Sequence, residues 1–109
     1  MTEDQEQAKF YQEAYNTIPQ VRGLLFSVPN GGTRNKIEAM KMKATGLTAG
    51  IPDMICLLNG PIAFEFKTEK GVVSPVQQHI HKIWNAAGIP VHVVRSWQTA
   101  LEILKNHIK

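Results

Sequence analysis

The chain has 109 residues, of which 43% are hydrophobic and 19% are charged, and its net charge is +3. This length and composition predict one folded domain over residues 1–109 and exclude a disordered chain. The positive charge is compatible with a polyanionic partner. No apolar run approaches the roughly 20 residues of a membrane span, so we expect no membrane partner. A single cysteine, Cys56, and a polar, acidic N-terminus predict a reducing, cytoplasmic location.

A first helix and a strand are expected before residue 29. Thr2, with Gln5 three residues later, has the pattern of a capping box and predicts a helix to about Asn16. After Pro19, residues 24–28 (LLFSV) predict a short buried strand. The positions that helical spacing predicts to be buried are Ala8, Tyr11, Ala14 and Tyr15.

A loop rich in Pro, Asn and Gly follows at residues 29–34 and leads into a second helix, capped by Thr33 or Asn35 and ending near Ala44. A glycine-rich loop before a helix can bind phosphate, and nearby cations would strengthen that binding. A tight turn before a solvated amphipathic helix explains the same residues equally well. The cations here are Arg34, Lys36, Lys41 and Lys43.

The most informative stretch is residues 50–67, GIPDMICLLNGPIAFEFK, in which two short apolar runs flank an Asn-Gly-Pro turn signal. This pattern predicts a β-hairpin. With its turn centred on Asn59-Gly60, Asp53 is expected opposite Phe66, beside Glu65 and Lys67.

Two carboxylates and an amine at one end of a hairpin indicate a candidate metal-binding and catalytic site. Adjacent carboxylates repel each other unless a proton or a cation lies between them, and hard oxygen ligands suit Mg²⁺ or Mn²⁺. A lysine beside such a metal can hold or activate a water molecule. The alternative is an ordinary hairpin with a Glu/Lys pair on its wet face. The G-x-P-D sequence that ends at Asp53 favours the metal site.

The remaining elements are a helix, a strand and a helix. Ser74, Pro75 and Gln77 predict a capped helix to Ala87, so Gln77 has a sufficient structural role as a capping residue. We interpret its two histidines, His79 and His81, as surface or rim residues on different sides of the helix. Its expected core face consists of Val76, Ile80, Ile83, Trp84 and Ala87.

Residues 89–95 predict a last strand, and Ser96 caps a final helix that ends near His107. The resulting order is helix, strand, helix, strand, strand, helix, strand, helix. One hairpin plus crossovers through helices predicts an α/β domain, with a mixed β-sheet flanked by helices.

The hairpin with Asp53 and then Glu65-x-Lys67 resembles the PD-(D/E)XK nuclease core. The chain is most similar to the VRR-NUC branch, the virus-type replication-repair nucleases. The similarity extends over nearly the whole chain, and it rests on the order of several motifs. These are VPNGG-x-R at 28–34, K-x-x-G-x-x-x-G-x-P-D at 43–53, EFK at 65–67, S-P-x-Q at 74–77 and A-G-I-P-V-x-V-V-R at 87–95.

The resemblance implies roles for individual residues. Asp53 and Glu65 would bind Mg²⁺ or Mn²⁺, together with the backbone carbonyl of Phe66, and Lys67 would position or activate the attacking water. Gln77 would be the family's glutamine near the catalytic site. The resemblance also implies an acidic residue in the first helix; Glu6 fits best and Glu3 is the alternative. Contacts to the DNA backbone would come from Asn30, Gly31, Arg34, Lys36, Lys41 and Lys43.

The implied activity is metal-dependent hydrolysis of DNA phosphodiester bonds. Small stand-alone members of the family are similar to Holliday-junction resolvases that act as homodimers. A four-way-junction endonuclease of bacterial or phage origin is therefore expected, with the number of metal ions left open. The alternative is a non-catalytic DNA-binding module that keeps the nuclease fold. A sequence-specific, restriction-like enzyme has no support, because no separate recognition domain fits in 109 residues.

Overall fold

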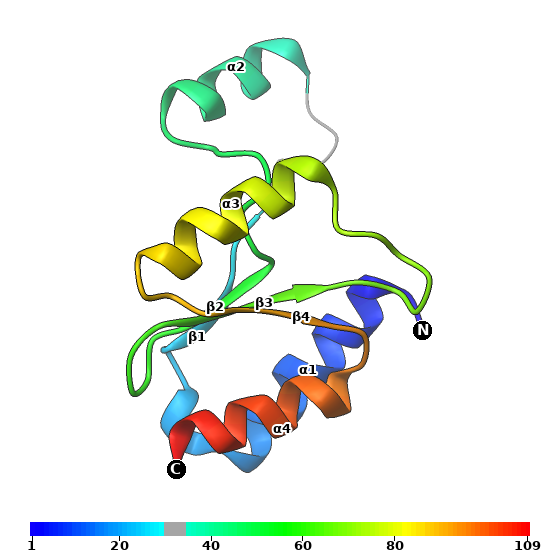
Figure 1. Cartoon of the computed structure of the whole chain (residues 1–109), viewed down its shortest axis with the longest axis vertical. Helices are drawn as coiled ribbons and strands as arrows, with labels where there is room; N and C mark the ends of the chain where they lie inside the picture. Colours follow the sequence, from blue (N-terminus) through cyan, green and yellow to red (C-terminus); the bar gives the residue numbers. More distant parts are fainter. Residues whose placement is uncertain (30–34) are drawn as a thin grey trace.

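The computed structural model describes residues 1–29 and 35–109 (Figure 1). Their elements follow the predicted order, with one short 3₁₀ turn, η1, added after the first helix. In chain order they are α1 (Glu3–Thr17), η1 (Pro19–Val21), β1 (Leu25–Ser27), α2 (Lys36–Ala44), β2 (Met54–Cys56), β3 (Ile62–Phe66), α3 (Pro75–Ala86), β4 (Val91–Val94) and α4 (Trp97–Ile108).

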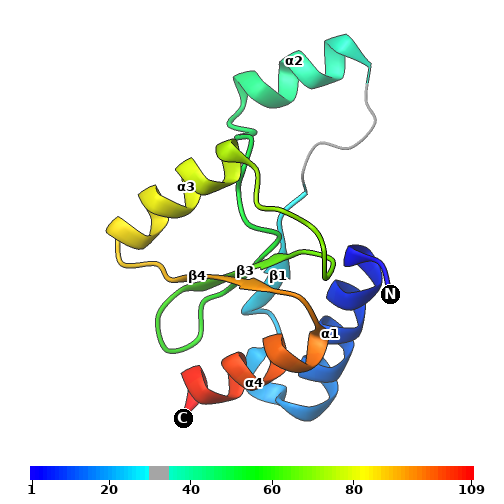
Figure 2. The same ribbon diagram turned by 45° about the vertical axis from the view of Figure 1, so that its right-hand side comes forward.

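The four strands form one mixed sheet in the order β1-β2-β3-β4. The β1–β2 and β2–β3 pairs are antiparallel, and β3 pairs in parallel with β4 after the crossover through α3. Helices α1 and α4 lie on one side of the sheet and α3 on the other, while α2 lies beyond α3 (Figures 1 and 2). The predicted mixed sheet flanked by helices is confirmed.

The helices begin at the predicted capping residues. The Thr2 hydroxyl accepts the backbone N–H of Gln5 at 3.1 Å, and the Gln5 side chain accepts the N–H of Thr2 at 2.8 Å. Asn35 caps α2 and Ser96 caps α4, each by accepting a backbone N–H three residues later. These bonds satisfy N–H groups that a helix start leaves without partners.

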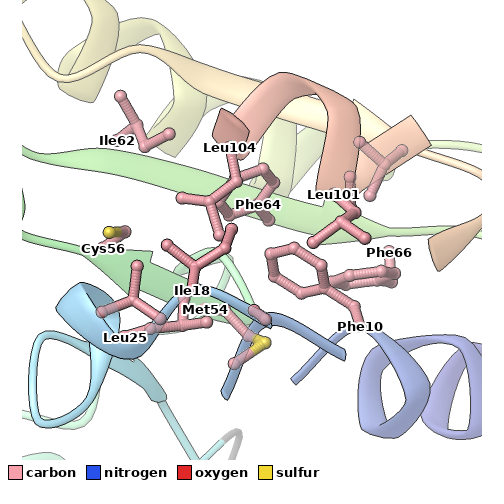
Figure 3. Close-up of a cluster of buried hydrophobic side chains, with 14 residues drawn as sticks. Phe10, Ile18, Leu25, Met54, Cys56, Ile62, Phe64, Phe66, Leu101 and Leu104 are labelled. Carbon is pink, nitrogen blue, oxygen red and sulfur yellow. The ribbon is translucent and has the colours of Figure 1, made fainter. Parts of the chain in front are cut away.

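The hydrophobic core lies between the sheet and helices α1 and α4 (Figure 3). The Phe10 ring centroid of α1 lies 4.9 Å from that of Phe64 and 5.7 Å from that of Phe66. Burying such a side chain stabilises the fold by about 1.5–3 kcal/mol. Because side chains alternate along a strand, Glu65 points to the opposite face, beneath α3. The strand residues that line the core are Leu25, Met54, Cys56, Ile62, Phe64, Phe66 and Val94.

The predicted register of the hairpin is wrong by one residue. Met54 pairs with Phe64, so one step further Asp53 faces Glu65 and not Phe66. A two-residue turn at Asn59-Gly60 needs a backbone N–H at position 61, and Pro61 has none. The strands are therefore joined by a longer loop, although the two turn residues still have positive φ angles of 56° and 88°.

The predicted buried stripe of α1 is correct at Ala14 and wrong at the other three positions. The helix buries Phe10 and Ala14, whereas Ala8 is exposed and Tyr11 and Tyr15 expose 39% and 42% of their surface. Phenylalanine can be buried without a hydrogen-bond partner, while a tyrosine hydroxyl favours water. This difference turns the Phe10 side of α1 toward the sheet.

The predicted core face of α3 is also wrong in part. Ile80 and Trp84 are partly buried, but Val76 and Ile83 expose 51% and 50% of their surface, and Ala87 is exposed. The sheet surface beneath α3 carries Glu65, so the helix turns a polar side chain toward it. That arrangement places the candidate active site between β3 and α3.

Helix α2 buries none of its residues. Its apolar side chains Ile37 and Met40 expose 68% and 70% of their surface. The predicted amphipathic helix is therefore present, with its apolar side uncovered.

Over residues 1–29 and 35–109, no helix combines the length and apolar character needed to cross a membrane.

Candidate active site

Asp53 lies directly before β2 and is fixed through both its side chain and its backbone. Its Oδ2 accepts the backbone N–H of Phe66 at 2.7 Å, and its carbonyl accepts the N–H of Val28 at 2.8 Å. A carboxylate that accepts a backbone N–H is oriented by the sheet and does not depend on a flexible partner. Asp53 therefore sits at a fixed position beside the end of β3.

Glu65 is the buried carboxyl group of the site, with 2% of its surface exposed. Burial raises the pKa of Glu65 to about 8, and a hydrogen bond with Asp53 and the charge of that residue act in the same direction. The positive charge of Lys67 lowers the same pKa. At neutral pH and without a bound cation, Glu65 therefore keeps its proton in the hydrogen bond to Asp53.

Lys67 follows Glu65 by two residues, so alternation places both side chains on the α3 face of the sheet. Its backbone N–H donates to the carbonyl of Val94 at 3.0 Å and extends the β3–β4 ladder. Its positive charge also lowers the pKa of His81. The half-buried Lys67 side chain is thus part of the same electrostatic cluster as the carboxyl pair.

His81 belongs to this site, and its prediction as a surface or rim residue is wrong. It exposes 8% of its surface, and its Nε2 lies 3.2 Å from Glu65 Oε1. Burial, followed by the charge of Lys67, lowers the pKa of His81. Its position four residues after Gln77 is a signal that could have found it, because residues four apart share one side of a helix. His79 is exposed as predicted.

Gln77 has the capping role that the sequence predicts. Its Oε1 accepts the N–H of Ser74 at 3.0 Å, and its own N–H donates to the Ser74 hydroxyl at 3.2 Å. The half-buried side chain also lines a cavity of about 470 Å³ between α3 and the segment that follows α2, shared with Lys43 and Gly50. Gln77 therefore fixes the start of the helix that carries His81.

The two acidic candidates of α1 have different surroundings. Glu6 Oε2 accepts the backbone N–H of Trp97 at 2.9 Å, so Glu6 binds the first residue of α4. Burial is the largest cause that raises the pKa of Glu65, and the charge of Glu3 is the smallest. Metal binding by either residue stays a prediction.

The donor set offers two carboxyl groups, from Asp53 and Glu65. Within residues 1–29 and 35–109, no group of three or more His, Cys, Asp or Glu side chains is placed to hold a metal ion. Two carboxylates nevertheless fit Mg²⁺, which commonly binds through one or two carboxylates and keeps several waters. The Phe66 carbonyl, the further ligand implied by the resemblance, belongs to the residue whose N–H holds Asp53.

The predicted DNA-binding residues fall into two groups. Lys36, Lys41 and Lys43 are exposed on α2, and Lys43 shares the cavity beside Gln77. This arrangement places one cation of α2 next to the start of α3. The other three, Asn30, Gly31 and Arg34, lie outside the described residues.

A four-stranded mixed sheet with helices on both faces, and a carboxyl pair at the end of its central hairpin, has the architecture of the PD-(D/E)XK class. A solved structure described as a VRR_NUC domain protein superposes on 99% of this chain and 88% of its own, with a TM-score of 0.84 and 19% sequence identity. The chain therefore has the VRR-NUC fold. No protein-family model matches the sequence, and no curated protein matches it.

Proposed function

We propose that the protein is a DNA nuclease that hydrolyses phosphodiester bonds with Mg²⁺ or Mn²⁺ bound at Asp53 and Glu65. The observation that carries this proposal is the pair of carboxyl groups beside Lys67, in which Glu65 is buried and Asp53 is partly buried. Burying one carboxyl group beside another is unfavourable for stability unless a proton or a cation compensates it. Such a cost is typical of a functional site.

Each residue then has a defined task. Asp53 and Glu65 hold the ion, with the Phe66 carbonyl as a further ligand. When bound, the ion supplies a water of lowered pKa and neutralises charge on the phosphate. Lys67 orients the attacking water through its ammonium group and stabilises the negative charge that develops in the transition state. Gln77 holds the start of α3 in place through its bond to Ser74.

The VRR-NUC fold supports a nuclease over the other functions that α/β domains perform. The similar solved structure is described as a VRR_NUC domain protein, a name that denotes a nuclease domain. A second candidate is a DNA-binding module without catalysis. It is favoured by the absence of a third acidic or histidine ligand among the described residues. The two proposals differ in one measurable property. The nuclease cleaves DNA when a divalent ion is present, whereas the binding module binds DNA and does not cleave it.

For substrate and assembly, we propose branched DNA, in particular four-way junctions, cut by a homodimer in a bacterial cell. The support is the resemblance to small stand-alone VRR-NUC proteins, and two sites would be needed to nick two strands. The exposed lysines of α2 are suited to contact the phosphate backbone.

The test is cleavage of labelled duplex, flap, single-stranded and four-way-junction DNA with Mg²⁺ or Mn²⁺. Wild type is compared with Lys67→Ala. Paired symmetric nicks in the junction, absent in the variant, would support the nuclease and the dimer. Tight junction binding without cleavage in either metal would reject the nuclease and favour the binding module. Sedimentation of the free protein measures the oligomeric state independently.

A further inference from the structure

His81 stands out because it is a buried polar side chain to which neither the resemblance nor the mechanism above gives a task. It exposes 8% of its surface and lies on the side of α3 that faces the sheet. A buried imidazole is costly unless it forms hydrogen bonds. Its Nε2 lies 3.2 Å from Glu65 Oε1. The hydrogen bond that offsets the burial of His81 is thus formed with Glu65, the carboxyl group proposed as a metal ligand.

We propose that His81 is a positioning residue that donates an Nε2–H hydrogen bond to Glu65 Oε1 and so fixes the orientation of that carboxyl group for metal binding. The inference rests on the proposed function. Its physical basis is that a carboxylate ligand can rotate about its side-chain bonds, and an outer hydrogen bond restricts that rotation before the ion arrives.

The direction of the hydrogen bond follows from the chemistry of the two groups. A carboxylate that binds a metal ion can only accept hydrogen bonds, so the imidazole must donate to Glu65 Oε1. The imidazole atom in contact is Nε2, so the proposal requires the tautomer of His81 that carries its proton on Nε2.

The matching contact at the other carboxyl group strengthens the inference. Asp53 Oδ2 is held by the backbone N–H of Phe66 at 2.7 Å. Each carboxyl group of the pair thus has one oxygen bound by a fixed protein group, one from β3 and one from α3. The α3 group is fixed in turn by the capping box of Ser74 and Gln77 at the start of that helix.

The first experiment determines the tautomer of His81 by ¹⁵N NMR of the metal-free protein at neutral pH. We expect a proton on Nε2 and none on Nδ1, with the exposed His79 as an internal reference. A proton on Nδ1 would overturn the proposal. This measurement is independent of catalysis and of any metal.

The second experiment measures Mn²⁺ affinity by calorimetry in wild type, His81→Leu, His81→Gln and the control His79→Leu. We expect His81→Leu to bind Mn²⁺ about 10- to 100-fold more weakly, the usual effect of removing an outer hydrogen bond. His81→Gln can still donate from its amide, so it should stay within about threefold of wild type. His79→Leu should not change the affinity, because His79 is exposed.

The thermal midpoint of each variant separates positioning from stability. A folded His81→Leu with wild-type Mn²⁺ affinity would overturn the inference, and so would equal losses of affinity in His81→Leu and His81→Gln. If His81→Leu does not fold, His81→Gln with weakened binding would overturn it. Wild type that binds no Mn²⁺, or binds it as well after Asp53→Ala, would instead reject the proposed metal site itself, and with it this role of His81.

Discussion

Glu65 is a carboxyl group at a buried position, where an apolar side chain would cost less free energy to bury. The strand neighbours Phe64 and Phe66 are almost fully buried on the opposite face, and Glu65 exposes 2% of its surface. Burial raises its pKa to about 8, because a negative charge is unfavourable where water is excluded. A bound cation would remove that cost, which is the physical argument for a metal at this residue.

The raised pKa of Glu65 predicts how stability depends on pH. Between its ordinary value of 4.5 and about 8, the folded protein holds a proton that the unfolded chain releases. The free energy of unfolding therefore falls as pH rises through this window, by a few kcal/mol in order of magnitude. Urea unfolding in a metal chelator, from about pH 5 to about pH 8, measures this fall.

The matched control is Glu65→Gln, which keeps the shape of the side chain and cannot ionise. The stability of this variant relative to wild type should increase across the same window. Parallel pH curves for the two proteins would contradict the raised pKa of Glu65.

The elements around the site are held together by close backbone contact, most clearly where the segment before β2 meets α3. A Cβ built on Gly50 would lie 2.8 Å from the carbonyl oxygen of Val76. Gly50 also has a φ of +87°, a conformation that favours glycine. The approach to Asp53 and the first turn of α3 are thus packed directly against each other.

Gly50→Ala is therefore expected to destabilise the protein more than Gly23→Ala. Both positions have positive φ, 87° and 81°, so both substitutions carry a similar backbone strain of about 1–3 kcal/mol. Only at Gly50 does the added methyl group meet another backbone, because nothing lies within 4 Å of it at Gly23. Urea unfolding of the two variants measures the difference. Equal destabilisation would contradict the close approach at Gly50.

A second contact between elements joins α1 to α4. Because Glu6 accepts the N–H of Trp97, Glu6→Ala should lower the free energy of unfolding by about 1 kcal/mol, the usual effect of removing a cap. The control is Glu13→Ala in the same helix, which removes only a surface ion pair with Lys9 and should cost a few tenths of a kcal/mol. Chemical denaturation compares the two, and an effect no larger in Glu6→Ala would argue against the hydrogen bond to Trp97.

The sequence is most informative where local chemistry decides the structure. The capping residues Thr2 and Ser74 predict two helix starts correctly, and Asn35, one of the two candidates for α2, caps that helix. A cap is predictable because it depends only on residues within one turn. The hairpin is predicted too, but its register depends on Pro61, whose missing N–H excludes the tight turn.

Prediction from the sequence fails where the surface that a helix packs against determines which face of that helix is buried. Hydrophobicity alone assigns Val76 and Ile83 of α3 to the core, yet the surface that α3 covers contains Glu65. The buried position of His81 escapes prediction for the same reason, because its environment comes from a strand sixteen residues away. The side chains on the sheet surface beneath α3, and not helical periodicity alone, decide which side of α3 is buried.

In the whole molecule, α2 lies apart from the sheet, beyond α3 (Figure 2). Its lysines are exposed to solvent. If these lysines contact DNA phosphates, changing Lys36, Lys41 and Lys43 to Gln should weaken binding to every DNA sequence similarly. The slope of log affinity against log salt concentration should shrink by about one for each phosphate that the variant no longer neutralises. Fluorescence anisotropy over a salt series measures this slope. An unchanged slope would show that α2 does not contact DNA.

The central claim is that Asp53 and Glu65 bind a divalent ion that enables DNA hydrolysis assisted by Lys67. The most direct measurement is the cleavage rate of a labelled DNA junction as Mg²⁺ is titrated into chelator-treated wild type, Asp53→Ala and Lys67→Ala, with folding checked by circular dichroism. The account predicts that wild-type cleavage requires the ion, and that the rate falls by at least about 10²-fold in each folded variant. Wild-type rates in either variant, or cleavage that persists in chelator, would contradict it.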